Sequence, residues 1–258
     1  MRFASLGSGS QGNGTVIEWS HGALLLDCGF SMKEAEIRLA KLGCHPSDLT
    51  ALVVTHEHSD HIKGVAALAR RYKTPVYMTP GTYHSRDLGS IPHLHLIEAY
   101  REFTLAGLKI EPVPVPHDAR EPAQFIFHAN DICLGVLTDL GSISPHVEER
   151  YRNCDALLLE ANHDPVMLAS GPYPPSLKRR VGGAWGHLSN QQTAGFLQRV
   201  NTEKLQALVI AHISQKNNSL AAAQAALSPV TENVKQVCYA CQDEGFSWIE
   251  LTSGHALQ

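Results

Sequence analysis

The feature that most constrains this chain is a short segment crowded with metal-binding side chains, "VVTHEHSDHIKG", Val53 to Gly64. Directly after an apolar run, it places four candidate ligands within six residues: His56, His58, Asp60 and His61. Imidazole nitrogens and carboxylate oxygens are common ligands of Zn²⁺. An apolar run that ends in such a group predicts a buried strand whose carboxyl end opens into a site.

The cluster is expected in a turn between a strand and a helix. "ALVVT" predicts a buried strand that ends at Thr55, and "HIKGVAALARR" predicts one helix after it. His56 and His58 are two residues apart, so an extended turn can point both the same way. Asp60 and His61 open the helix and can face a second position. The zinc motif HExxH is excluded, because Asp60 stands where that motif requires histidine.

Further candidate ligands end three other apolar runs. His117 follows "VPVP", Asp139 follows "LGVLT" and His212 follows "LVIA". A catalytic zinc takes about three protein ligands and a water, so each of two metals needs at least one of them. Any one of these residues alone is best interpreted as an ordinary loop residue. Because the same arrangement recurs at four strand ends, we interpret the four as one site.

The rest of the chain predicts a globular α/β protein, with residues 1–258 in one domain. Hydrophobic residues make up 43% and charged residues 18%, a balance that excludes a disordered chain. Short β-like runs alternate with helical patterns such as "SMKEAEIRLAKLG" and "SNQQTAGFLQRVN", which predicts layered structure with mixed sheets. The segment "SGPYPPSLKRRVGGAWG", Ser170 to Gly186, is the most loop-like stretch.

Net charge and hydropathy limit which binding partners the sequence predicts. The net charge of −4 gives no overall basic field, so any contact with nucleic acid must come from a local patch. The N-terminal "MRFASLGSGSQGNG" has no apolar signal core, and no run is long enough to span a membrane. We therefore expect a cytoplasmic protein with no membrane partner. The sequence does not indicate an oligomeric state.

Taken together, these motifs resemble the metallo-β-lactamase superfamily. "THEHSDH" is similar to its H-x-H-x-D-H signature, and "LLLDCG", with Asp27, is similar to its first motif. His117, Asp139 and His212 fall in the order of its later motifs. The resemblance runs from "FASLGSGSQGNGT" to "AHIS". It implies a four-layer αββα sandwich of two mixed β-sheets, with a dinuclear metal centre at one edge.

The resemblance also implies a ligand set for two divalent ions, Zn²⁺ or Mn²⁺. The first ion takes His56, His58 and His117, the second takes Asp60, His61 and His212, and Asp139 bridges them. Asp27 is implied to hold ligands in orientation rather than to bind metal. Zinc suits the histidine-rich set, whereas the carboxylates and the hard oxygens of a phosphate suit manganese as well.

A second pair of residues bears on the substrate. Glu160 ends "LLLE", and His187 follows a glycine-rich turn in "GGAWGHLSN". They resemble the Glu–His pair of the tRNase Z branch, which implies a general acid that protonates the leaving oxygen of a phosphodiester. The alternatives are structural: Glu160 as the partner of an arginine, and His187 as a neighbour of the helix cap Ser189. His163 is a competing histidine near Glu160.

Polar residues near these motifs are candidate contacts for the substrate phosphate. The glycine-rich "GSGSQGNG" can cradle a phosphate or form a tight hairpin, and it is no P-loop because it lies between two strands. "LKRR" can form a local basic patch in the segment that leads to His187. The candidates are Ser8, Ser10, Lys178, Arg179, Arg180, Asn217 and Asn218.

Four motifs, "FASLGSGSQGNGT", "THEHSDHIKG", "LLLEANHD" and "GHLSN", together resemble the WalJ/YycJ-like branch of the superfamily. That branch is linked to a metal-dependent exonuclease acting on DNA from 5′ to 3′. The resemblance implies a phosphodiesterase that uses a metal-bridging hydroxide, with Asp60, Glu160 and His187 in catalysis and DNA favoured over RNA. Two alternatives stay open: hydrolysis of a small cyclic phosphodiester, lactone or thioester, and a non-catalytic metal-binding module.

Overall fold

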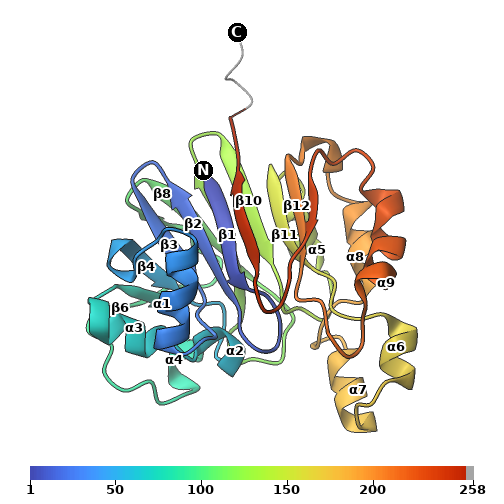
Figure 1. Ribbon diagram of the computed structural model, residues 1–258, viewed down its shortest axis with the longest axis horizontal. Coiled ribbons are helices and arrows are strands. Elements are labelled where there is room, and N and C mark those ends of the chain that lie inside the picture. The colour runs from blue at the N-terminus through green and yellow to red at the C-terminus, as the bar shows by residue number, and fades with distance from the viewer. Residues whose placement is uncertain (254–258) are drawn as a thin grey trace.

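Two seven-stranded mixed β-sheets pack face to face with helices on their outer surfaces, in a computed structural model that describes residues 1–253 (Figure 1). This confirms the four-layer αββα sandwich that the family resemblance implies. In spatial order, the first sheet contains β14 (Phe246–Glu250), β1 (Arg2–Gly7), β2 (Gly14–Trp19), β3 (Gly22–Leu26), β4 (Leu49–Val53), β5 (Val76–Met78) and β6 (Leu94–Leu96). The second contains β13 (Val237–Tyr239), β12 (Ala207–Ala211), β11 (Ala156–Glu160), β10 (Ile132–Leu137), β9 (Ala123–Ala129), β8 (Leu108–Pro114) and β7 (Phe103–Leu105).

The two sheets share one pattern of strand direction. The pairs from β14 to β3 and from β7 to β10 are antiparallel. The pairs from β3 to β6 and from β10 to β13 are parallel. The carboxyl ends of parallel strands lie at one edge of a sheet, so each sheet presents several strand ends together.

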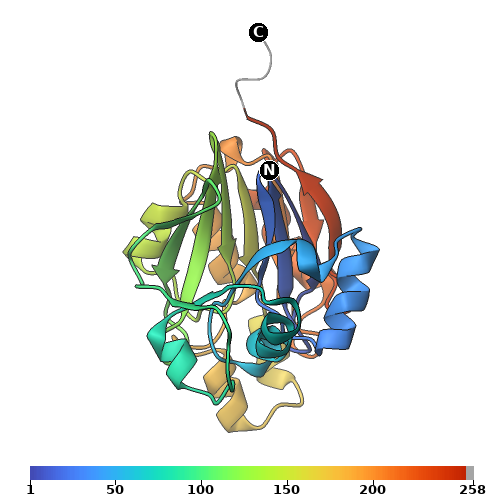
Figure 2. The same cartoon turned by 90° about the vertical axis from the view of Figure 1, so that its left-hand side faces the viewer.

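Helices cover the outer faces and one edge (Figure 1). α1, α3 and α4 lie beside the first sheet, and α5, α8 and α9 lie beside the second, while α6 and α7 project at the lower edge of Figures 1 and 2. The bounds are α1 (Met32–Lys41), α2 (Ser59–Ile62), α3 (Val65–Tyr72), α4 (Pro80–His84), α5 (Pro145–Tyr151), α6 (Pro165–Ser170), α7 (Pro175–Val181), α8 (Asn190–Leu197) and α9 (Leu220–Leu227).

The core lies in three layers, which explains why the strands read as continuous apolar runs. On β11, Leu158 packs between the two sheets, whereas Leu157 and Leu159 pack under the outer helices. Successive side chains of a strand point to opposite faces, so a strand covered on both sides needs apolar residues at every position. A third cluster, which includes Leu25 and Leu39, lies between the first sheet and its helices.

Local signals in the sequence define two helix starts. Ser31 caps α1 by accepting a hydrogen bond from the backbone N–H of Glu34. Ser189 caps α8, where Gln192 completes a reciprocal capping box. Both serines stand at the start of patterns that the sequence analysis predicts as helices.

Three boundaries differ from the predictions. The strand predicted to end at Thr55 ends at Val53, and the single helix predicted after it divides into α2 and α3 around Gly64. The division reflects a close approach, because a Cβ at Gly64 would lie 2.3 Å from the carbonyl oxygen of Phe30. The segment predicted as a loop contains α7, which buries no residue and therefore has no apolar stripe to reveal it.

No helix within the described part of the chain is both long enough and apolar enough to cross a membrane.

Candidate metal centre and active site

The candidate ligands gather where strands of both sheets end, near α2 at the lower edge of Figure 1. His56 and His58 follow β4, and His61 lies on α2. Asp139 follows β10 and His212 follows β12. Asp27, Asp139 and His212 all have a positive φ, of 61°, 54° and 52°. A non-glycine residue pays a conformational penalty in this region, and such residues often cluster at functional sites.

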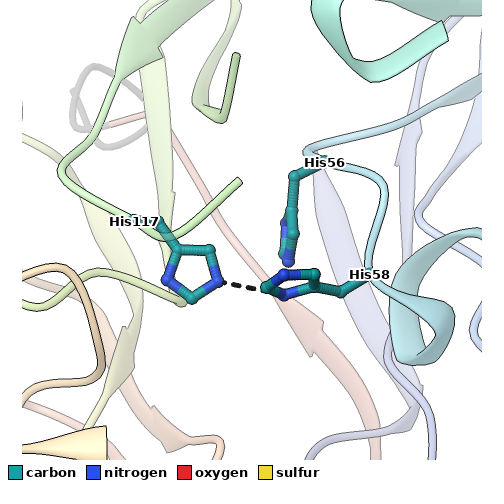
Figure 3. A group of neighbouring side chains, drawn as sticks. All are labelled: His56, His58 and His117. Carbon is teal, nitrogen blue, oxygen red and sulfur yellow. Dashed lines mark hydrogen bonds between the residues drawn. The ribbon is translucent and has the colours of Figure 1, made fainter. Parts of the chain in front are cut away.

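Three histidines form the first group, and their ligand atoms all lie within 4.8 Å of one another: His56, His58 and His117 (Figure 3). His58 Nδ1 lies 3.2 Å from His117 Nε2. His117 Nδ1 lies 3.1 Å from the carbonyl oxygen of Gly186, to which it donates, so its Nε2 carries the lone pair. Burial holds the pKa of His56 well below its usual range and lowers the pKa of His117. Neutral imidazoles with free lone pairs are what a metal requires.

His56, His61 and Asp139 form a second group. His61 Nδ1 donates to Asp27 Oδ2 at 2.8 Å, so Asp27 fixes the tautomer of the ring. His61 Nε2 then faces Asp139 Oδ2 at 3.3 Å and Asp60 Oδ2 at 3.7 Å. Burial works to lower the pKa of His61, but Asp139, Asp27 and Asp60 together hold that pKa well above its usual range. The group therefore lies in a negative field that attracts cations.

Two buried atoms of these groups have no hydrogen-bond partner among the described residues: His56 Nε2 and Asp139 Oδ2. A buried polar atom without a partner costs free energy and calls for an explanation. Both atoms belong to residue types that bind divalent metals. The donor set and these two atoms therefore fit a metal centre.

Glu160 joins two imidazoles beside this centre. The residue is fully buried, and its Oε1 accepts from His187 Nδ1 at 2.8 Å and from His212 Nδ1 at 2.9 Å. Its Oε2 accepts from the backbone N–H groups of Leu140 and Leu188. Burial works to raise the pKa of Glu160, but His187 and His212 lower it to about 2, which keeps the carboxylate ionised. The structure thus pairs Glu160 with His187, and it adds a bond to His212 that the sequence does not reveal.

A cleft of about 350 Å³ opens beside the centre. Of the candidate phosphate contacts, Ser10, Arg180 and Asn217 line it, as does Arg86, which the sequence analysis did not select. Arg180 Nε is hydrogen-bonded to Asp118 Oδ2. Both polar atoms of the Asn217 side chain are buried without a partner among the described residues.

The other candidate phosphate contacts lie outside the lining of the cleft. Ser8 Oγ accepts from the backbone N–H of His212 at 2.9 Å, so it supports a strand end. Asn218 donates to the carbonyl oxygens of Ala161 and Asn162. Lys178 Nζ donates to the carbonyl oxygen of Ala169, and Arg179 is exposed. For these four residues the structure shows a structural contact or an exposed position away from the cleft lining, and their contact with a phosphate stays a prediction.

Sequence reasoning missed Asn13 as a member of the site. Asn13 Nδ2 lies 3.0 Å from His61 Nε2, and the Asn13 backbone N–H donates to the carbonyl oxygen of Asp60 at 2.8 Å. Its side-chain oxygen also accepts from the Gly9 N–H at 2.8 Å. The glycine-rich loop between β1 and β2 therefore packs against α2. The only signal for this role was the position of Asn13 within that loop.

Paired mixed sheets with a histidine and carboxylate cluster at the strand ends define the metallo-β-lactamase fold, and comparisons with known proteins agree. A family model described as "Beta-lactamase superfamily domain" matches residues 23–213. The crystal structure of the metallo-β-lactamase fold protein YhfI from Bacillus subtilis has a TM-score of 0.74 and 15% identity, and the match covers 96% of this chain and 99% of that one. That likeness concerns the fold.

Similarity to curated proteins identifies a family within this superfamily. The chain is 35% identical to exodeoxyribonuclease YycJ of Bacillus anthracis over 90% of its own length and 89% of the relative. It is 37% identical to exodeoxyribonuclease WalJ of Streptococcus pneumoniae over 84% of this chain and 83% of that one. The chain belongs to the β-lactamase superfamily and, within it, to the family of YycJ and WalJ.

Proposed function

We propose that this protein is a metal-dependent phosphodiesterase that removes nucleotides from DNA in the 5′-to-3′ direction. The observation that carries the proposal is the bond of 2.8 Å between His187 and the fully buried Glu160, beside a cluster that fits divalent ions. A proton donor next to a metal centre suits a phosphodiester, whose alkoxide leaving group needs a proton. The similarity to two exodeoxyribonucleases over most of the chain supports DNA as the substrate.

The proposed ligand set holds two ions, Zn²⁺ or Mn²⁺. One ion would take His56, His58 and His117, the other would take Asp60, His61 and His212, and Asp139 would lie between them. Ions bound there would lower the pKa of water to supply a nucleophile and would neutralise charge on the phosphate.

The chain's own residues do the remaining work in this proposal. Glu160 accepts a hydrogen bond from His187 Nδ1. In the doubly protonated ring, the Nε2–H is then left to give its proton to the departing oxygen. Ser10, Arg180 and Asn217 line the cleft, and in this proposal they hold phosphate oxygens. Arg180 is hydrogen-bonded to Asp118, so its charge is partly neutralised and its orientation is fixed.

The test uses purified protein loaded separately with Mn²⁺ and Zn²⁺, with the bound metal measured. Duplex DNA with a labelled 5′ phosphate is incubated with each form, and the products are followed over time. Mononucleotides released progressively from the 5′ end are the expected result. Intact DNA with both metals bound would refute nuclease activity, and release from the 3′ end would refute the polarity.

A second candidate function is hydrolysis of a small molecule. The cleft has a volume of about 350 Å³, and small ligands bind in clefts of similar volume. Salt separates the two candidates. Binding of a nucleic-acid polymer weakens steeply as salt rises, because the polymer releases counterions. A small phosphodiester, lactone or thioester would show a much weaker dependence of KM on salt.

A further inference from the structure

Trp185 exposes an indole ring on the turn that leads to His187 of the candidate active site. Its exposed fraction is 63%, and it lies two residues before His187 in the chain. The other two tryptophans are more buried, and each donates its indole N–H to a backbone carbonyl oxygen: Trp19 to Ala106 and Trp248 to Leu42. Within residues 1–253, Trp185 makes no hydrogen bond. Packing therefore does not account for this large aromatic side chain.

The backbone around Trp185 is held firmly. The Gly186 N–H donates to the carbonyl oxygen of Gly183 at 2.9 Å, and the His187 N–H donates to that of Val181 at 2.8 Å. Gly141 packs closely against this turn, since a Cβ there would lie 2.4 Å from the Gly186 nitrogen. The turn that carries the indole thus has a fixed position relative to His187.

The cleft next to this turn has the character of a surface for a nucleic-acid strand. Gly186 and His187 belong to its lining, together with Tyr173, Arg86 and Arg180. Arginines can contact phosphates along a strand, while an aromatic face stacks on any base. Trp185 is not itself a lining residue, but the two residues that follow it are. We therefore place its exposed indole at the border of the cleft, on the turn that leads to the proposed proton donor.

We propose that Trp185 is a stacking platform for an unpaired base that flanks the scissile phosphate. The inference rests on the proposed function and deepens it, because it specifies what the enzyme needs besides a phosphodiester. The substrate must present at least one unstacked base beside the bond that is cut. Single-stranded or frayed DNA ends meet this need, and small phosphodiesters without a base do not use the platform.

The experiment compares Trp185→Ala and Trp185→Phe with the wild type on two substrates. Single-stranded DNA with a labelled 5′ end tests the platform, and bis(p-nitrophenyl) phosphate reports the metal centre alone. Trp185→Ala should raise KM for DNA about 5- to 150-fold, the equivalent of about 1–3 kcal/mol, with kcat and the small-substrate rate kept. Trp185→Phe keeps an aromatic face and should recover most of the affinity. Tyr100→Ala is the matched control, because Tyr100 is 73% exposed and lies in a different hollow, which His146 and Arg150 also line.

Fluorescence gives a second measurement. A phosphorothioate oligonucleotide that resists cleavage should quench the emission of the wild type and leave that of Trp185→Phe nearly unchanged. A wild-type KM for DNA in Trp185→Ala, with no quenching, would overturn the platform and leave the nuclease intact. Wild-type protein that hydrolyses bis(p-nitrophenyl) phosphate but neither cleaves nor binds DNA would overturn both.

Discussion

Replacing Asp27 with asparagine tests how the site is held together, because the change removes one charge and almost no volume. The carboxylate accepts three hydrogen bonds at 2.8 Å: Oδ2 from His61 Nδ1 and Thr55 Oγ1, and Oδ1 from the Thr55 N–H. An asparagine side chain has only one oxygen. In either orientation its amide N–H₂ therefore faces a donor, either the Thr55 N–H or His61 Nδ1–H.

The expected cost follows from these contacts. Losing a buried hydrogen bond to a charged group should lower the free energy of unfolding by about 1.5–3 kcal/mol. If the amide faces His61, the ring changes tautomer and its Nε2 carries a proton instead of a lone pair. Residues that orient metal-binding histidines typically contribute about 10- to 100-fold to metal affinity or activity. We expect a loss of that size in zinc affinity for Asp27→Asn.

The assay is competition with a fluorescent zinc chelator, combined with thermal unfolding of the same samples. Asp131→Asn serves as the control. It makes the same chemical change as Asp27→Asn, but at an exposed residue in the turn between β9 and β10. Zinc affinity and thermal stability equal to the wild type in Asp27→Asn would show that Asp27 does not orient His61. A loss of stability with unchanged zinc affinity would refute the tautomer reasoning alone.

Three further changes test the centre and the surrounding fold. His187→Ala should lower kcat about 10²- to 10⁴-fold while the metal content measured by emission spectroscopy stays at the wild-type level. Asp139→Ala should abolish turnover and reduce metal content, since its carboxylate belongs to two clusters that could hold a metal, one with His56 and His61 and one with Glu160, His187 and His212. Glu111→Gln should lower Tm by about 2–4 °C at pH 6, because Glu111 loses charge-assisted contacts to the part-exposed Arg150 and to His128. Burial works to raise the pKa of Glu111, but these partners lower it to about 2 from 4.5. The stabilisation that the Glu111 carboxylate provides is therefore present above pH 4.5 and is lost as the pH falls toward 2. The difference in Tm between Glu111→Gln and the wild type should vanish near pH 2.

The sequence predicts most strands, and the polar residues that follow them, for a physical reason. Strands covered on both faces are apolar at every position, so a polar residue directly after the run marks the strand end. Asp139, His117 and His212 could each be located in this way. β6 and β7 carry little apolar signal, because each has three residues and Leu96 and Thr104 are exposed.

The positions of the loop residues could not be predicted from local pattern. Asn13 reaches His61 only because the loop between β1 and β2 packs on α2, across 48 residues of sequence. The turn that carries Trp185 packs closely against Gly141, which lies more than 40 residues away in the sequence. Contacts of this kind depend on how distant segments meet, and neither hydrophobic period nor capping signals carry that information.

Glu160 shows how the fold couples two roles that the sequence suggested as separate. Its Oε1 accepts from both His187 and His212, so one carboxylate oxygen orients the proposed acid and a proposed ligand. If Glu160 served His187 alone, then Glu160→Gln would match His187→Ala in kcat and metal content, and the double variant would be no worse than either. Because His212 shares the oxygen, we expect Glu160→Gln to lose zinc affinity as well, which His187→Ala should not. Zinc titrations of the two variants and their combination measure this coupling. Equal zinc affinity in both single variants would show that Glu160 orients only His187, the proposed acid, and not His212.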